Sequence, residues 1–112
     1  MDERYYIEDL EGKILKAIDK ASNTAEICSS LNCGKDLQYG DVTRTDIECQ
    51  LAGIIEMAEI IRLIDVYLEW FPETAAGEEF QGQRERSRAN QRNLRVEMLA
   101  YFDWLKERIA AE

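Results

Sequence analysis

The stretch from Asp46 to Phe71, DIECQLAGIIEMAEIIRLIDVYLEWF, is apolar around most of a helical circumference. Its apolar residues recur at steps of three and four, the period of an α-helix. One row is Ile47, Leu51, Ile54, Ala58, Ile61 and Leu68, and the other is Met57, Ile60, Ile64, Tyr67 and Phe71. A helix with two apolar rows needs packing partners on two sides. We therefore expect the rest of the chain, or a second copy of it, to cover this segment.

Two further segments have the same period and flank the central one. The segment 3–31 alternates steps of three and four from Ile7 to Leu31, and Asn23 with Glu26 forms a capping-box-like pair that offers a break near Asn23. The segment 83–110 is amphipathic, with Leu94, Met98, Tyr101, Leu105 and Ile109 on one side. Loops are expected at 33–43 and 72–82, since glycines occur in both and Pro72 disfavours helical geometry at Phe71.

These patterns predict an all-α fold in a single domain covering residues 1–112. We expect a small bundle of three long helices at about 3–31, 46–71 and 83–110, the first with a candidate break near Asn23. The second and third helices should form an antiparallel hairpin. Because the central helix has two apolar rows, we expect a homodimer or a higher oligomer.

Composition limits the classes of partner. The chain has 112 residues, 23 acidic and 14 basic, for a formal net charge of −9. This charge argues against nonspecific binding of nucleic acid or of an anionic membrane surface. No apolar run is long enough to span a bilayer, and the N-terminus lacks the apolar core of a signal peptide, so we expect a cytoplasmic protein without a membrane segment.

The sequence offers no catalytic or metal-binding signature, and we expect no enzyme, no metal and no cofactor. There are three cysteines and no histidine, so zinc would need a carboxylate or a second chain. We expect the cysteines to be reduced, with Cys28 and Cys49 in the core. Glu56 and Glu59 lie one turn apart, but a divalent cation would need a second acidic pair on a facing helix.

Basic residues are concentrated in the last segment. Residues 1–80 hold 18 acids and 7 bases, while residues 81–112 hold 5 acids and 7 bases. An arginine stripe on one helical face consists of Arg84, Arg88, Arg92 and Arg95. The stripe has two interpretations: it neutralises acids of the central helix, or it binds an anion through planar guanidinium donors.

A hairpin loop of about eleven residues would set the pairing between the last two helices, given an equal rise per residue. Arg95 would then lie level with Glu59, and Arg84 and Arg88 would lie near Asp65 and Glu69. The same register places Tyr101 over Gly53. An interior glycine costs about 1 kcal/mol relative to alanine, so Gly53 should either admit a close helix, for which Ala17 and Ala21 are the expected partners, or form a notch for a ligand.

The expected function is that of a non-enzymatic acidic interaction protein, such as an inhibitor or adaptor that occupies a basic site on another macromolecule. Inhibitors carried by phages and mobile elements are examples of this class. The candidate acidic surface is Asp2, Glu3, Glu8, Asp9, Glu11, Asp36 and Asp41. The alternative is an oligomeric binder of a small anionic nucleotide through the arginine stripe. A lesser alternative is a helix-turn-helix DNA-binding regulator, with Thr24 to Leu31 as its first helix and a recognition helix from Thr43.

Overall fold

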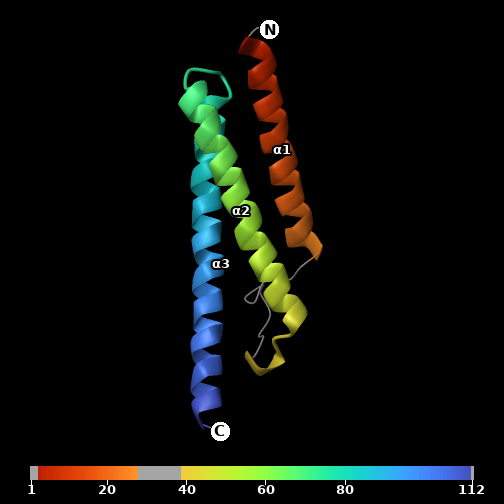
Figure 1. Ribbon diagram of the computed structural model, residues 1–112, viewed down its shortest axis with the longest axis vertical. Coiled ribbons are helices and arrows are strands. Elements are labelled where there is room, and N and C mark those ends of the chain that lie inside the picture. The colour runs from red at the N-terminus through yellow and green to blue at the C-terminus, as the bar shows by residue number, and fades with distance from the viewer. Residues whose placement is uncertain (1–2, 28–38, 112) are drawn as a thin grey trace.

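The computed structural model describes residues 3–27 and 39–111, and this part of the chain is all-helical, with no strand. The elements are α1 (Glu3–Ile27), a short 3₁₀ helix η1 (Tyr39–Asp41), α2 (Arg44–Trp70) and α3 (Gly77–Ala111). Figure 1 shows α2 between α1 and α3 in an elongated bundle of 64 × 23 × 22 Å. The central position of α2 follows from its two apolar rows.

Local signals define both ends of α2. Thr43 is its N-cap, and the Thr43 hydroxyl accepts a hydrogen bond from the Asp46 backbone N–H at 3.2 Å. The Asp46 carboxylate accepts one from the Thr43 N–H at 2.8 Å, which completes a capping box. At the other end, the Phe71 N–H donates to the Tyr67 carbonyl at 2.7 Å, and Pro72 follows. The helix therefore begins two residues before Asp46, the expected first residue.

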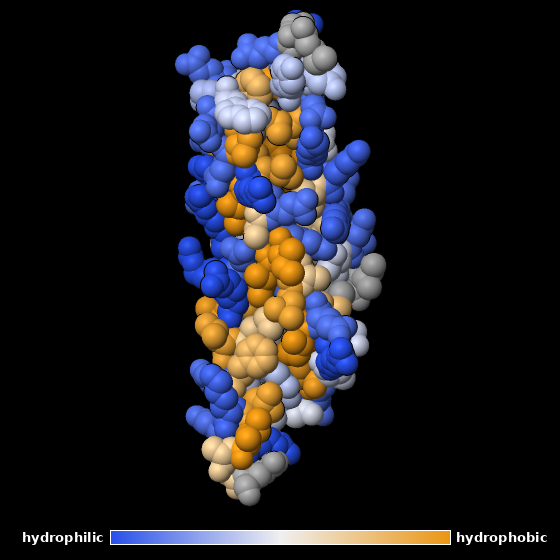
Figure 2. All heavy atoms as spheres, in the orientation of Figure 1, coloured by the Kyte–Doolittle hydropathy of each residue, from blue (hydrophilic) through white to orange (hydrophobic). Residues whose placement is uncertain are grey.

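The hydrophobic core lies mainly where α1 meets the second apolar row of α2. Its buried residues are Ile14, Ala17, Ala21, Ile60, Ile64, Tyr67 and Phe80. Two of its three residues on α1 are alanines, whose small side chains favour a close approach of the two helices. The first row of α2 is covered only in part, because Leu51 is 44% exposed and Ala58 is also exposed. Figure 2 shows an apolar band that runs along most of the length of this face of the bundle.

Tyr67 of α2 connects α1, α2 and the turn before α3. Its ring packs edge-on against Phe71 and Phe80, with centroids 5.9 and 5.0 Å away. Its hydroxyl donates to the Glu11 carboxylate on α1 at 2.8 Å and also contacts the Thr74 hydroxyl in the turn before α3. A buried tyrosine hydroxyl needs such partners, so this side chain joins α1, α2 and the turn.

Of the two alternatives that the sequence left open near Asn23, the structure has the continuous helix: α1 runs through this position to Ile27. The Thr24 hydroxyl bonds back to the Lys20 carbonyl at 3.0 Å and contacts the Glu56 carboxylate on α2 at 2.8 Å. These contacts hold Thr24 within the helix rather than at the start of a new one. The end expected at residue 31 lies outside the described residues.

α3 begins at Gly77, six residues before the expected start at residue 83. The Gly77 N–H bonds to the Thr74 carbonyl at 3.1 Å, and Glu78 and Glu79 occupy the first turn, where negative charge favours the helix dipole. The shorter connection moves the pairing with α2 by about two turns. A Cβ added at Gly53 would lie 3.2 Å from Leu94, not from Tyr101, and the expected contact of Gly53 with Ala17 and Ala21 is replaced by this approach of α3.

Cys49 is disulfide-bonded, so the expectation of a reduced Cys49 is wrong. Cys28, which was expected in the core with Cys49, lies outside the described residues. Disulfides are typical of oxidising compartments, and the reduced-cysteine argument for a cytoplasmic location therefore fails. In the part of the chain that the structure describes, no helix has the length and hydropathy needed to cross a membrane.

The Tyr67 hydroxyl should contribute measurable stability. We expect Tyr67→Phe to lower the free energy of unfolding at neutral pH by about 1–2 kcal/mol, because Glu11 and Thr74 lose their partner. Burial raises the pKa of Tyr67; the Thr74 hydrogen bond opposes this shift and Glu11 adds to it. The folded state thus holds the proton more tightly than the unfolded chain does. The stability from this difference is complete below the ordinary pKa of 10.0 and is lost as the pH rises through the higher folded value.

Urea unfolding followed by circular dichroism across the alkaline range measures both effects. The stability of the wild-type protein should fall more steeply above the ordinary tyrosine pKa than that of Tyr67→Phe. Equal stability and equal pH dependence of the two proteins would show that the hydroxyl does not link the helices.

Candidate functional site

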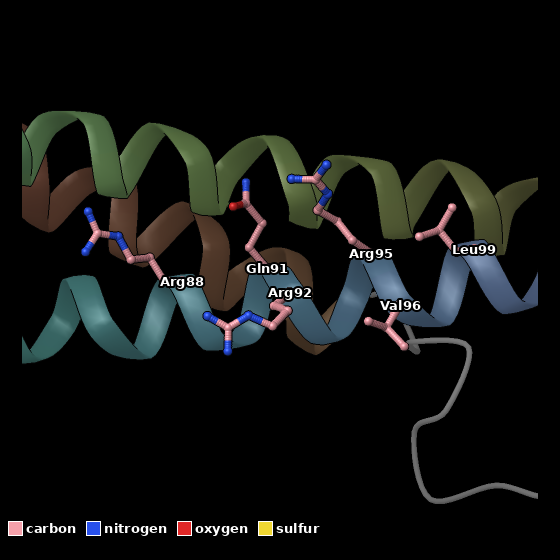
Figure 3. A pocket seen from close by; sticks show the side chains of 6 residues that line it. All are labelled: Arg88, Gln91, Arg92, Arg95, Val96 and Leu99. Atoms are coloured by element: carbon pink, nitrogen blue, oxygen red, sulfur yellow. The ribbon is translucent and has the colours of Figure 1, made fainter.

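A shallow pocket lies along one flank of α3 and contains most of the arginine stripe. It has a volume of about 370 Å³, and Figure 3 shows its six lining residues. We call this surface the arginine face: Arg88, Gln91, Arg92, Arg95, Val96 and Leu99. All six belong to α3, so the pocket is open rather than enclosed between helices.

Polar contacts between α2 and α3 fix which side of α3 carries the arginine face. The buried Gln50 side chain donates to the Leu94 carbonyl at 3.2 Å and to the Glu97 carboxylate at 2.8 Å. Gln91 donates to the Ile54 carbonyl at 3.1 Å. The buried Gln50 donor would be costly to leave unpaired, and together the bonds of Gln50 and Gln91 fix the rotation of α3 about its axis.

The two arginines nearest the turn are paired within the chain. Arg84 Nη1 lies 2.9 Å from Asp65 Oδ1, and the Arg84 side chain is only 24% exposed. Arg88 lies 3.7 Å from the same Asp65 oxygen and 3.1 Å from Glu85. The expected approach of Arg84 and Arg88 to Asp65 is therefore present. Among the described residues, no ion pair joins Glu59 or Glu69 to the stripe, because the two-turn shift moves Arg95 away from Glu59.

The other two arginines of the stripe lack such ion pairs in the described part of the chain. Arg92 and Arg95 are exposed, and neither has a carboxylate partner among residues 3–27 and 39–111. Beside them on α3, Val96 is 59% exposed and Leu99 is 62% exposed. Two unpaired cations next to two exposed aliphatic side chains suit a partner that is both anionic and apolar.

The acids expected to form one surface do not come together. Glu3 and Glu8 are exposed near the start of α1, whereas Asp41 is exposed in η1 at the opposite end of the bundle (Figure 1). Asp9 pairs with Lys13 at 2.9 Å, and Glu11 accepts the Tyr67 hydroxyl. Asp2 and Asp36 lie outside the described residues. Only Glu3 and Glu8 therefore remain as exposed acids without an ion pair at this end of α1.

The structure adds two acids that the sequence interpretation missed. Asp19 and Glu26 are exposed on α1 and follow Glu8 by 11 and 18 residues, close to three and five helical turns. We call Glu8, Asp19 and Glu26 the acidic row. None of the three has an ion-pair partner in the described part of the chain, and Leu15 lies between them, 56% exposed. The spacing of these acids, close to whole numbers of helical turns, could have identified the row from the sequence.

A second basic cluster lies where α1 meets α2. Lys13, Lys16 and Lys20 line a pocket of about 350 Å³ together with Ala17, Glu59 and Leu63. Glu56, by contrast, is buried and accepts from Thr24, and its second oxygen has no hydrogen-bond partner. Glu56 and Glu59 thus point into different surroundings. No cluster of three potential metal ligands occurs among the described residues.

Comparison with protein-family models, with curated proteins and with solved structures found no match. The identification of the candidate surfaces therefore rests only on the geometry of this chain.

The intrachain part of the arginine stripe can be tested by its stability contribution. We expect Asp65→Ala to lower the free energy of unfolding by about 1 kcal/mol, because the largely buried Arg84 loses its nearest carboxylate. Glu69→Ala is the matched control, since Glu69 is an exposed acid on the same helix with no ion pair in the described structure; its effect should stay within about 0.5 kcal/mol. Chemical unfolding of both variants measures the difference, and equal effects would contradict the pairing.

Proposed function

We propose that this protein is a non-enzymatic binding protein, an inhibitor or adaptor whose acidic row engages a basic surface of another macromolecule. The observation that carries the proposal is the row itself. Glu8, Asp19 and Glu26 are exposed and unpaired within the described structure, and they extend along about 27 Å of α1 by helical rise. A line of carboxylates on one face of a helix suits a partner with cations arranged along a line.

Two further features support the acidic row as the contact surface. The net charge of −9 would speed and orient the encounter with a basic partner. Exposed Leu15 supplies an apolar contact in the middle of the row, where binding free energy is usually concentrated. The proposal includes self-association and takes the α2–α3 pair as an antiparallel hairpin, which the order of contacts supports: Asp65 with Arg84, then Ile54 with Gln91, then Gln50 with Glu97.

A differential capture experiment tests this function. The bait proteins are the wild type, a row variant (Glu8→Lys, Asp19→Lys, Glu26→Lys) and a control with the same charge change (Glu69→Lys, Glu73→Lys, Glu107→Lys). All three control acids are exposed and lie outside the row. A partner should bind the wild type and the control, fail to bind the row variant, and dissociate as salt is raised, because exposed charges are screened.

Capture of the same proteins by all three baits, or capture that is insensitive to salt, would contradict the acidic row as the contact surface. Circular dichroism of each bait confirms that the helices are intact before the comparison.

A second candidate function is the binding of a small anionic ligand, such as a nucleotide, at the arginine face. The observation that favours it is the pair of unpaired cations, Arg92 and Arg95, at the pocket of about 370 Å³. With ATP as the probe, this function predicts a higher melting temperature for the wild type and a lost shift in Arg92→Gln with Arg95→Gln. Arg86→Gln is the control, since Arg86 lies on α3 outside the pocket. A shift that is equal in all three proteins, or absent from the wild type, would exclude the arginine face as a nucleotide site.

The helix-turn-helix alternative is not carried forward. It requires a separate helix that starts at Thr24, whereas α1 continues through this residue.

A further inference from the structure

A second pocket lies at the end of the bundle where α1 begins and α2 passes into the turn before α3. Figure 1 shows these two segments at the same end of the molecule. The pocket, which we call the end pocket, is formed by Glu3 and Ile7 of α1, by Trp70 at the end of α2 and by residues 71–74 of the turn. Its volume is about 280 Å³. Pockets for drug-sized ligands usually have about 300–1,000 Å³, so the end pocket suits a single side chain.

Contacts with the core hold one wall of the end pocket in place. The Phe71 ring packs edge-on against the ring of Tyr67, with centroids 5.9 Å apart. The Thr74 hydroxyl contacts the Tyr67 hydroxyl and donates to the Phe71 carbonyl at 3.4 Å. Because Tyr67 is fully buried, Phe71 and Thr74 are fixed before any ligand binds. A preformed pocket loses less conformational entropy on binding.

Trp70 offers this pocket an open aromatic face. It is 60% exposed, more than any other aromatic residue in the described chain. Among the described residues, Trp70 has neither a ring contact nor a cation above its ring, whereas the Arg108 guanidinium carbon lies 5.4 Å from the centroid of the Trp104 ring. Tryptophan is the aromatic side chain that attracts cations most strongly. Trp70 can therefore accept a cation from another molecule.

The charge around the end pocket is strongly negative. Residues 3–11 and 69–79 hold eight acids and one base, Arg4, which does not line the pocket. Glu3 and Glu73 line it and are exposed, and neither forms an ion pair within the described part of the chain. The two carboxylates repel an anion and attract a cation. Charge and aromatic surface thus favour the same class of ligand.

We propose that the end pocket binds an arginine side chain on the surface of a partner protein. The guanidinium plane stacks on the Trp70 ring, and its N–H groups donate to the carboxylates of Glu3 and Glu73. The methylene groups of the arginine pack on Ile7 and Pro72. A lysine side chain has the same charge, but its compact ammonium group has no plane to stack and no fork of donors.

This site rests on the proposed function in one respect, the basic character of the partner. The end pocket and the acidic row share no residue, so the two proposals can fail separately. A peptide titration measures the end pocket alone, whereas the row variant in the capture experiment leaves every residue of the end pocket unchanged.

Titration of the full chain with acetyl-Leu-Arg-Leu-amide, followed by ¹H–¹⁵N NMR, tests the proposal. The indole N–H signals report on Trp70 and Trp104 separately. Trp104 is the internal control, because its ring lies 5.6 Å from that of Tyr39 in η1, at the opposite end of the bundle (Figure 1). We expect a saturable shift of the Trp70 signal and a constant Trp104 signal.

Two control peptides identify the group that is recognised. Citrulline in place of arginine keeps the shape and removes the charge, and this peptide should bind at least about tenfold more weakly. Lysine in place of arginine keeps the charge, and this peptide should bind about threefold more weakly. Equal binding of the arginine and citrulline peptides would overturn the proposal. Equal binding of the arginine and lysine peptides would overturn the assignment of arginine.

Substitutions in the protein locate the site. With the backbone amide of Thr74 as the reporter, Trp70→Ala should weaken binding of the arginine peptide about fivefold and Glu73→Gln about threefold. Glu69→Gln is the matched control, because Glu69 is an exposed acid next to Trp70 that does not line the pocket. It should leave the dissociation constant unchanged, and circular dichroism verifies that each variant is folded.

Equal weakening by Glu73→Gln and Glu69→Gln would show that the peptide responds to the net charge of this end of the bundle and would overturn the end pocket as the site. The absence of a saturable shift at Trp70, or a shift of equal size at Trp104, would overturn it as well.

Discussion

The constraint on which the structure depends is the burial of α2 on two sides. Ile60, Ile64 and Tyr67 are at most 1% exposed, and α1 and α3 pack mainly on α2 rather than on each other. Burial of large apolar side chains contributes about 1.5–3 kcal/mol each, and helices in proteins derive most of their stability from such tertiary packing. Tyr67 adds a polar link to this apolar contact, because its hydroxyl reaches both Glu11 and Thr74.

The sequence predicted three helices because the period of three and four persists over long segments, and α2 shows it twice. It did not predict the register of α3. The letters around Gly77 and Gly82 indicate a loop, yet α3 starts at Gly77, and the pairing shifts by about two turns. Because seven residues return nearly to the same face, Leu94 replaces Tyr101 opposite Gly53 while the core face of α3 stays the same. The sequence left a break near Asn23 open and the structure has none, and the prediction of a reduced Cys49 was wrong, because a disulfide joins Cys49 to another part of the chain.

The arrangement of the charged residues could likewise be predicted only in part from the sequence. The sequence interpretation grouped acids from residues 2–11 with Asp36 and Asp41 as one surface, but Asp41 lies at the opposite end of the bundle from Glu3 and Glu8. Helical spacing instead aligns Glu8 with Asp19 and Glu26. The arginine stripe was visible in the sequence, but its division was not: Arg84 and Arg88 reach Asp65, whereas Arg92 and Arg95 have no carboxylate partner in the described structure. One half of the stripe therefore pairs with an acid of α2, and the other half does not.

Native-state amide hydrogen exchange tests the central role of α2 most directly, because it ranks the local stability of each helix. We expect the slowest amides to lie in α2 between Ile60 and Tyr67 and to exchange only on global unfolding. Amides near the start of α1 and in the last turns of α3 should exchange faster through local opening. Slower exchange in α1 or α3 than in this part of α2 would show that the fold does not depend chiefly on the burial of α2.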